Sequence, residues 1–223
     1  MEGTMQNPLV TSSEVKHHFP VVVMQRDHEN VADLNANLSA FILSQEVQFR
    51  NTPENAAKSP KIATEGGYQT SERMNVFLQK NEAIHVLREK IVMPAIVDYL
   101  KQTFGSASQG MSPFPVAWAN VLRNGDWQRP HSHASQGNVV SGVYYVKVPK
   151  EPYPKGCIEF INPLTVSLHH GYSASQRIIP EEGRLLLFPP YHIHYVHPVS
   201  SEEPRVVIAF DVMLRAANTN FVF

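Results

Sequence analysis

The pattern of hydrophobic and polar residues changes near the middle of the chain. In the first half, apolar residues recur at three- and four-residue steps within residues 28–48 and 81–105, the spacing of an amphipathic helix. The first stripe consists of Val31, Leu34, Leu38, Phe41 and Ile42. We expect two helices, the second capped by Asn81 and ended by Gly105. Pro94 lies inside the second helix and should kink or split it.

Two other segments of the first half lack this helical spacing and predict a strand and a loop. Residues 19–27 form a run rich in β-branched side chains, which predicts an early strand added to the edge of a later sheet. Residues 49–72 are polar and contain Pro53, Pro60 and a pair of glycines, so we interpret them as a long loop. Because long loops are often functional, this loop is a candidate lid over a site.

The second half consists of short apolar segments separated by Pro, Gly, Asn and Ser. The segments are 113–123, 138–148, 156–162, 176–180, 183–190 and 204–214. Many short strands with turns between them indicate an antiparallel sandwich or barrel, of which the jelly roll is the common closed form. The predicted fold is therefore mainly β: a cupin-like double-stranded β-helix core at 113–215, packed by a largely helical support region at 29–105, in a single domain 1–223.

Composition narrows the classes of function and partner. The chain has 223 residues, a hydrophobic content of 43% and a net charge of −1, which fits one globular domain without a basic surface for nucleic acid. No stretch is long enough to span a membrane, and the first residues do not have the pattern of a signal peptide. The lone Cys157 cannot form an internal disulfide. We expect a cytoplasmic protein, with no nucleic-acid or membrane partner.

Histidines supply the candidate chemistry. His131 and His133 are two residues apart, so on a strand their imidazoles would point to the same side. A second cluster contains His192, His194 and His197, of which we expect at most one to be a metal ligand, the others being surface or supporting residues. Three imidazoles on one face of a metal leave other positions open, and open sites with imidazole ligands are typical of non-haem iron oxygenases.

Arg205 opens the apolar run RVVIAFDVM. That run lacks the alternation of an exposed strand, so the guanidinium should lie at the mouth of a buried strand rather than in solvent. A guanidinium there offers a planar fork to a carboxylate. Close to a metal, it would suit a dicarboxylic cosubstrate.

Several motifs carry a family resemblance. They are GGYQT at 66–70, the W-x-N of Trp118 and Asn120, H-x-H at 131–133, SGVYYVKVP at 141–149, and FPPYHIHYVHP at 188–198 followed by Arg205. In this order, over roughly residues 60 to 213, they resemble the 2-oxoglutarate/Fe(II)-dependent oxygenase superfamily, and within it a group of small oxygenases of bacteria and phage.

The resemblance implies roles for individual residues. Fe(II) would bind His131, His133 and His194, the last favoured by its H-x-V-x-P frame, and Arg205 would hold the far carboxylate of 2-oxoglutarate. Tyr145 stands where a tyrosine often assists that arginine, with Tyr144 the less favoured choice. Asn120 stands where some members contact the cosubstrate. His133 is a departure, because the superfamily usually has Asp or Glu there.

The implied activity is a hydroxylase that couples decarboxylation of 2-oxoglutarate to oxidation of a substrate by O₂. One alternative is a cupin-type dioxygenase with three histidines and no 2-oxoglutarate, which would not need Arg205. Another is a non-catalytic jelly roll that binds a metal or ligand. The substrate, a small molecule or a peptide, is not specified by the sequence, and exposed edge strands could pair in a homodimer.

Overall fold

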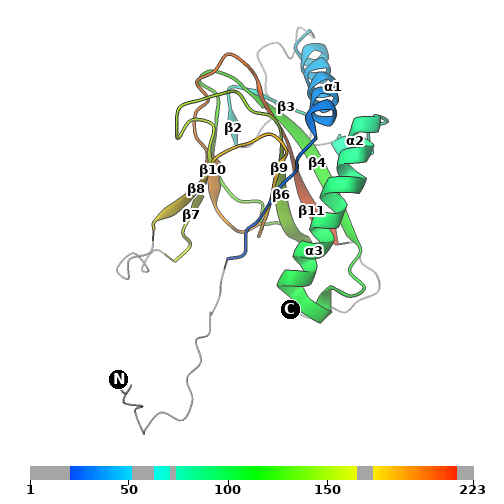
Figure 1. The fold of residues 1–223 in the computed structure, drawn as a ribbon. Coiled ribbons are helices and arrows are strands. Elements are labelled where there is room, and N and C mark those ends of the chain that lie inside the picture. Colours follow the sequence, from blue (N-terminus) through cyan, green and yellow to red (C-terminus); the bar gives the residue numbers. More distant parts are fainter. Residues whose placement is uncertain (1–20, 52–62, 71–73, 165–172, 215–223) are drawn as a thin grey trace, which may run out of the picture.

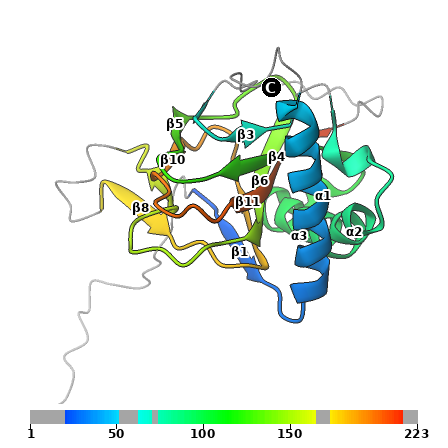
Figure 2. The ribbon, with the colours of Figure 1, turned by 90° about the horizontal axis from the view of Figure 1, so that it is seen from above.

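The computed structural model describes residues 21–51, 63–70, 74–164 and 173–214. Two antiparallel sheets face each other, and helices cover the outer side of the larger one (Figures 1 and 2). The large sheet has the order β1 (Met24–Asp27), β9 (Arg184–Phe188), β6 (Asn138–Lys147), β11 (Arg205–Leu214), β4 (Pro113–Leu122), β3 (Tyr68–Gln69). The small sheet has the order β2 (Thr64–Glu65), β5 (Trp127–His131), β10 (His194–Val196), β7 (Ile158–Ile161), β8 (Ser175–Ile178). The predicted jelly-roll fold with packing helices is confirmed.

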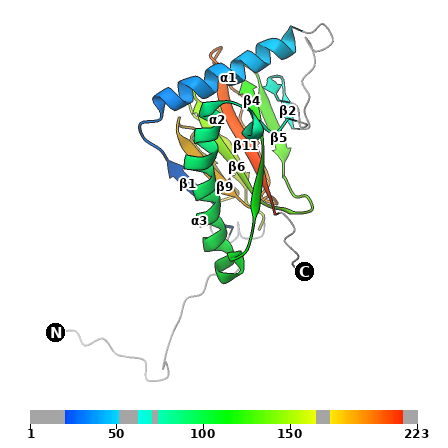
Figure 3. The same ribbon diagram turned by 90° about the vertical axis from the view of Figure 1, so that its right-hand side faces the viewer.

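The helical layer lies on one face of the large sheet, as Figure 3 shows for α1 (Ala32–Arg50) and α3 (Met93–Phe104). Between α2 (Glu82–Val86) and α3, residues Leu87–Val92 form a π-helical segment, η2. Short 3₁₀ segments are η1 (Val76–Leu78) and η3 (Gly105–Ser108). The effect predicted for Pro94 is found here: proline has no N–H and crowds the preceding turn, and the wider π turn accommodates it. None of the helices in the described ranges is long and apolar enough to cross a membrane.

Strand β11 lies at the centre of the large sheet and is covered on both faces. Val206, Ile208, Phe210 and Val212 pack in the core beneath the helices. The alternate residues, beginning with Arg205, face the small sheet. Burial on both sides explains why this strand has no polar alternation in the sequence.

The loop predicted at 49–72 contains the end of α1 and two short strands among its described residues, so that prediction was wrong there. Thr64–Glu65 form β2 and Tyr68–Gln69 form β3, and the two strands belong to different sheets. The chain turns between them at Gly66 and Gly67, whose φ angles are +77° and +25°. A Cβ on Gly66 would lie 1.8 Å from Asp126 Oδ1, so only glycine fits this corner. Residues 52–62 and 71–73 of the candidate lid lie outside the described residues.

The buried carboxylate of Glu159, on β7, connects parts of the small sheet through hydrogen bonds. It is 3% exposed and accepts hydrogen bonds from Arg177 (2.5 Å), Ser175 and His197 (2.5 Å). Burial opposes ionisation of the carboxyl, but the hydrogen bonds from Arg177 and Ser175 outweigh it and lower the pKa of Glu159 to about 2.

Glu159→Gln is therefore expected to lower the free energy of unfolding by about 2 kcal/mol at pH 7, because it removes the charge that these donors share. A lowered carboxyl pKa stabilises the fold above the unfolded value of 4.5, and this stabilisation is lost as the pH falls toward 2. Urea unfolding of both proteins at pH 7 and pH 3 tests this. A difference that is the same at both pH values would contradict it.

Candidate metal centre and cosubstrate pocket

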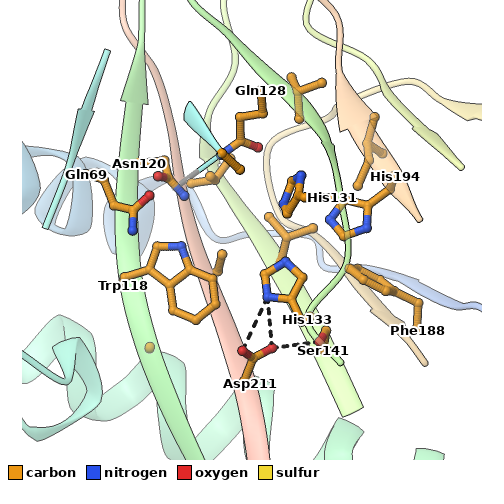
Figure 4. Close-up of a pocket in the computed structure, with 18 of the residues that line it drawn as sticks. Gln69, Trp118, Asn120, Gln128, His131, His133, Ser141, Phe188, His194 and Asp211 are labelled. Carbon is orange, nitrogen blue, oxygen red and sulfur yellow. Dashed lines mark hydrogen bonds and ion pairs between the residues drawn. The ribbon is translucent and has the colours of Figure 1, made fainter. Parts of the chain in front are cut away.

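Three histidines meet between the sheets, at the ends of two short strands (Figure 4). His131 ends β5 and His194 begins β10, and the two are direct cross-strand partners with ring centroids 4.4 Å apart. The His133 ring lies 5.1 Å from that of His131 and 5.3 Å from that of His194. One ligand atom of each lies within 4.8 Å of the others. They are suited to hold one metal ion.

The prediction that His131 and His133 lie on one face of a strand was wrong. Strand β5 ends at His131, and His133 lies in the following loop. Two hydrogen bonds hold the His133 backbone: its N–H donates to Pro190 O (2.8 Å), and Asn138 Nδ2 donates to its carbonyl (3.0 Å). The imidazoles meet because the loop turns back, not because of strand alternation.

Hydrogen bonds fix the orientation of all three rings. His131 Nδ1 lies 2.6 Å from Arg129 O, and His194 Nδ1 lies 2.9 Å from His192 O. Because a carbonyl only accepts, each Nδ1 carries the proton and leaves Nε2 with a free lone pair. His133 Nδ1 is likewise next to a carboxylate, 3.3 Å from Asp211 Oδ2. Nε2 of each ring is thus the atom available to a metal.

Burial also keeps the imidazoles of His131 and His194 neutral, because it lowers the pKa of both. It lowers the pKa of His194 to about 3, and the neighbouring His131 adds to the effect. A neutral imidazole is the form that binds a metal, so no proton has to be displaced at neutral pH.

A cavity of about 500 Å³ extends from the histidines along the large sheet. The registers of β4, β11 and β6 arrange its floor in rows. One row is Asn120, Val207 and Tyr145; the next is Trp118, Ala209 and Val143; the third is Val116, Asp211 and Ser141. Arg205 closes one end beside Leu122. The floor is therefore polar at both ends and apolar in the middle.

The end that contains Arg205 is charged, and the carboxylate of Glu151 acts on the Arg205 guanidinium electrostatically. Arg205 is 2% exposed, and its guanidinium lies 5.2 Å from the centre of the Tyr145 ring. Among the described residues no carboxylate forms an ion pair with it, and burial lowers its pKa. Arg205 Nε, Tyr145 Oη and Asn120 Oδ1 are buried without hydrogen-bond partners in the described ranges. Unsatisfied buried polar groups are costly, so this end is suited to an anionic ligand.

All six residues predicted for the site line this one cavity: Asn120, His131, His133, Tyr145, His194 and Arg205. Tyr144 points the other way, and its hydroxyl donates to Asn35 Oδ1 (2.9 Å) beneath α1. Of the remaining histidines of the second cluster, His197 pairs with Glu159 and His192 packs against Phe160.

Asp211 and Ser141 were missed by the sequence analysis. A signal for Asp211 was present: counting in twos from Arg205 along the strand reaches Asp211, so a strand with one face on the site presents Arg205 and Asp211 to it.

Comparisons with known proteins agree with this geometry. Residues 116–211 match the family model described as "Putative 2OG-Fe(II) oxygenase". No curated protein matches the sequence.

Solved structures share the fold. A Pseudomonas putida prolyl-4-hydroxylase is 17% identical, with a TM-score of 0.60 over 87% of this chain and 93% of that chain. A Trichoplax adhaerens prolyl hydroxylase is 15% identical, with a TM-score of 0.57 over 86% of this chain and 83% of that one. A viral collagen prolyl hydroxylase of Paramecium Bursaria Chlorella virus-1, solved as a 2OG complex, is 12% identical, with a TM-score of 0.55 over 85% and 94% of the two chains.

The match of the strand region to the family model covers the histidines, the arginine and the strands that place them. The fold of the solved structures extends the likeness to the helices. Residues 116–211 are thus similar to the 2-oxoglutarate/Fe(II)-dependent oxygenases, enzymes that use Fe(II) and 2-oxoglutarate, and the chain shares its fold with solved prolyl hydroxylases.

Proposed function

We propose that His131, His133 and His194 hold the iron, and that Arg205 binds the distal carboxylate of 2-oxoglutarate in the same cavity. The observation that carries the proposal is the juxtaposition of three oriented imidazoles with a buried guanidinium that has no carboxylate partner among the described residues. A metal site alone would not need that guanidinium, and a buried charge without a partner is destabilising.

The residues around the cavity bind 2-oxoglutarate in two ways, through polar contacts and by excluding water. Arg205 holds the far carboxylate by a planar pair of N–H donors, and the Tyr145 hydroxyl donates a further hydrogen bond to it. Val207, Ile158 and Val196 line the same end of the cavity and exclude water, which strengthens these charged contacts. When bound, iron and 2-oxoglutarate supply the activation of O₂ that oxidises a substrate while 2-oxoglutarate is converted to succinate and CO₂.

Formation of succinate tests the proposed function. The purified protein, supplied with Fe(II), O₂ and 2-oxoglutarate, should convert 2-oxoglutarate to succinate, slowly without substrate and faster with it. A protein that binds both but forms no succinate with any candidate substrate would be a binding module instead.

Tyr145→Phe is expected to raise the 2-oxoglutarate concentration at half-saturation about 10-fold, because a hydrogen bond to a charged group is lost. Tyr144→Phe is the matched control: its hydroxyl bonds Asn35 outside the cavity, so 2-oxoglutarate binding should not change while stability falls. If the two variants bind 2-oxoglutarate alike, the assignment of Tyr145 fails.

The partners and the location of the protein are also proposals. We propose a small-molecule or peptide substrate, since the cavity between the sheets is large enough for a side chain or a metabolite beside 2-oxoglutarate. The lone cysteine supports a cytoplasmic location. A homodimer formed through an edge strand and a single domain spanning 1–223 stay predictions.

A further inference from the structure

Asp211 is the one carboxylate that lines the described cavity, and it lies against a proposed metal ligand. Its two oxygens are 3.2 and 3.3 Å from His133 Nδ1, and Oδ1 accepts a hydrogen bond from Ser141 Oγ (2.7 Å; Figure 4). Asn138 Nδ2 completes the group, because it donates both to Ser141 Oγ (3.3 Å) and to the carbonyl of His133 (3.0 Å). The carboxylate is therefore held in place relative to the His133 ring.

In the described part of the chain, the charge of Asp211 is not neutralised by Lys or Arg, since none of them forms an ion pair with it. Arg205 faces the same cavity from the same strand, but six residues away, a distance of about 20 Å along an extended chain. The charge of Asp211 is thus available to the metal centre.

His133 differs in this respect from the other two histidines. Nδ1 of His131 and of His194 donates to a main-chain carbonyl, whereas Nδ1 of His133 donates to a carboxylate. A carboxylate partner raises the basicity of an imidazole ligand and fixes its tautomer more strongly than a carbonyl does. Non-haem Fe(II) sites commonly combine two histidines with one carboxylate, whereas the ligands that converge here are three imidazoles.

We propose that Asp211 is a positioning residue that supplies, through His133, the negative charge that a carboxylate ligand would otherwise bring to the metal. Fe(II), dianionic 2-oxoglutarate and Arg205 together carry one net positive charge, and Asp211 offsets it. The inference rests on the proposed function, since it requires the three histidines to bind the metal.

Co(II) serves as the probe, because it binds imidazole sites without the oxidation that complicates Fe(II). Affinity is measured on the metal-free protein by competition with a chromophoric chelator. Asp211→Asn, which keeps the shape and loses the charge, should weaken Co(II) binding by about 10- to 100-fold. Thermal unfolding of the metal-free variants shows whether the fold is retained, and Ser141→Ala, which leaves the charge, should weaken binding less than Asp211→Asn does.

A double-mutant cycle separates this role from a general structural one. His133→Asp places a carboxylate in the ligand set itself, so adding Asp211→Asn in that background should change Co(II) affinity by less than about 3-fold. An equal loss in both backgrounds, or no loss in the wild-type background, overturns the proposal. If His194→Ala binds Co(II) as tightly as the wild type, the assignment of the three histidines as metal ligands is wrong. This result differs from both outcomes that overturn the role of Asp211.

Discussion

Replacing His194 by alanine is expected to abolish Fe(II) binding and, with it, turnover of 2-oxoglutarate. His194 is 4% exposed and faces His131 across the β10–β5 pair. Its Nδ1 donates to His192 O, so the ring is already oriented with Nε2 toward the metal and loses little conformational freedom on binding. Without it, the imidazoles of His131, at the end of β5, and of His133, in the loop that follows, remain. Iron content after anaerobic reconstitution, followed by succinate formation, measures the effect.

The control is His85→Ala, the same substitution at an exposed residue of α2. It should bind one equivalent of Fe(II), as the wild type should. The metal-free His194→Ala protein should still fold, because the lost hydrogen bond to a carbonyl contributes about 1 kcal/mol. One equivalent of tightly bound iron in His194→Ala would show that the metal lies elsewhere.

Replacing Arg205 by methionine is expected to raise the dissociation constant of 2-oxoglutarate by about 30-fold or more, because removing one partner of a buried charge pair costs about 2 to 5 kcal/mol. Methionine fills the space of the aliphatic stem. Since the guanidinium has no ion-pair partner among the described residues, the ligand-free variant should be as stable as the wild type or more so. Isothermal titration with 2-oxoglutarate and Fe(II), and thermal unfolding without them, measure both effects.

Arg184→Met is the matched control for this variant. Arg184 is similarly buried, at 7% exposed, but it is paired with Asp27 and lies outside the cavity. That variant should lose stability and keep its affinity for 2-oxoglutarate. If Arg205→Met binds 2-oxoglutarate as tightly as the wild type, the assignment of Arg205 is wrong. If the wild type oxidises its substrate without 2-oxoglutarate, the cupin-type dioxygenase becomes the better account.

The long strands could be predicted because burial on both faces leaves a local signal. The apolar runs at 138–148 and 204–214 correspond to β6 and β11, and the β-branched run at 19–27 contains β1, which pairs with β9 at the sheet edge. Strands β5 and β10 left no such signal. They are short and partly polar, and they form because each pairs with the other and with its neighbours in the small sheet.

The identity of the site residues could be predicted from the sequence, but the way in which they are positioned could not. His131, His133, His194 and Arg205 followed from spacing and motif, because the chemistry of a metal and a diacid limits which residue types can serve. The path of the loop after His131 and the hydrogen bond from His133 to Asp211 depend on residues far apart in the chain. Such contacts have no local pattern, so only the structure reveals them.

The most direct measurement is the visible absorption spectrum of the protein during anaerobic titration with Fe(II) and 2-oxoglutarate. If the histidines and Arg205 act in one cavity, a charge-transfer band of the iron-bound 2-oxoglutarate should appear and saturate at one equivalent of each. The band should be absent in His194→Ala and should need far more 2-oxoglutarate in Arg205→Met. Binding of both Fe(II) and 2-oxoglutarate to the wild type without this band would place them in separate sites and contradict the account.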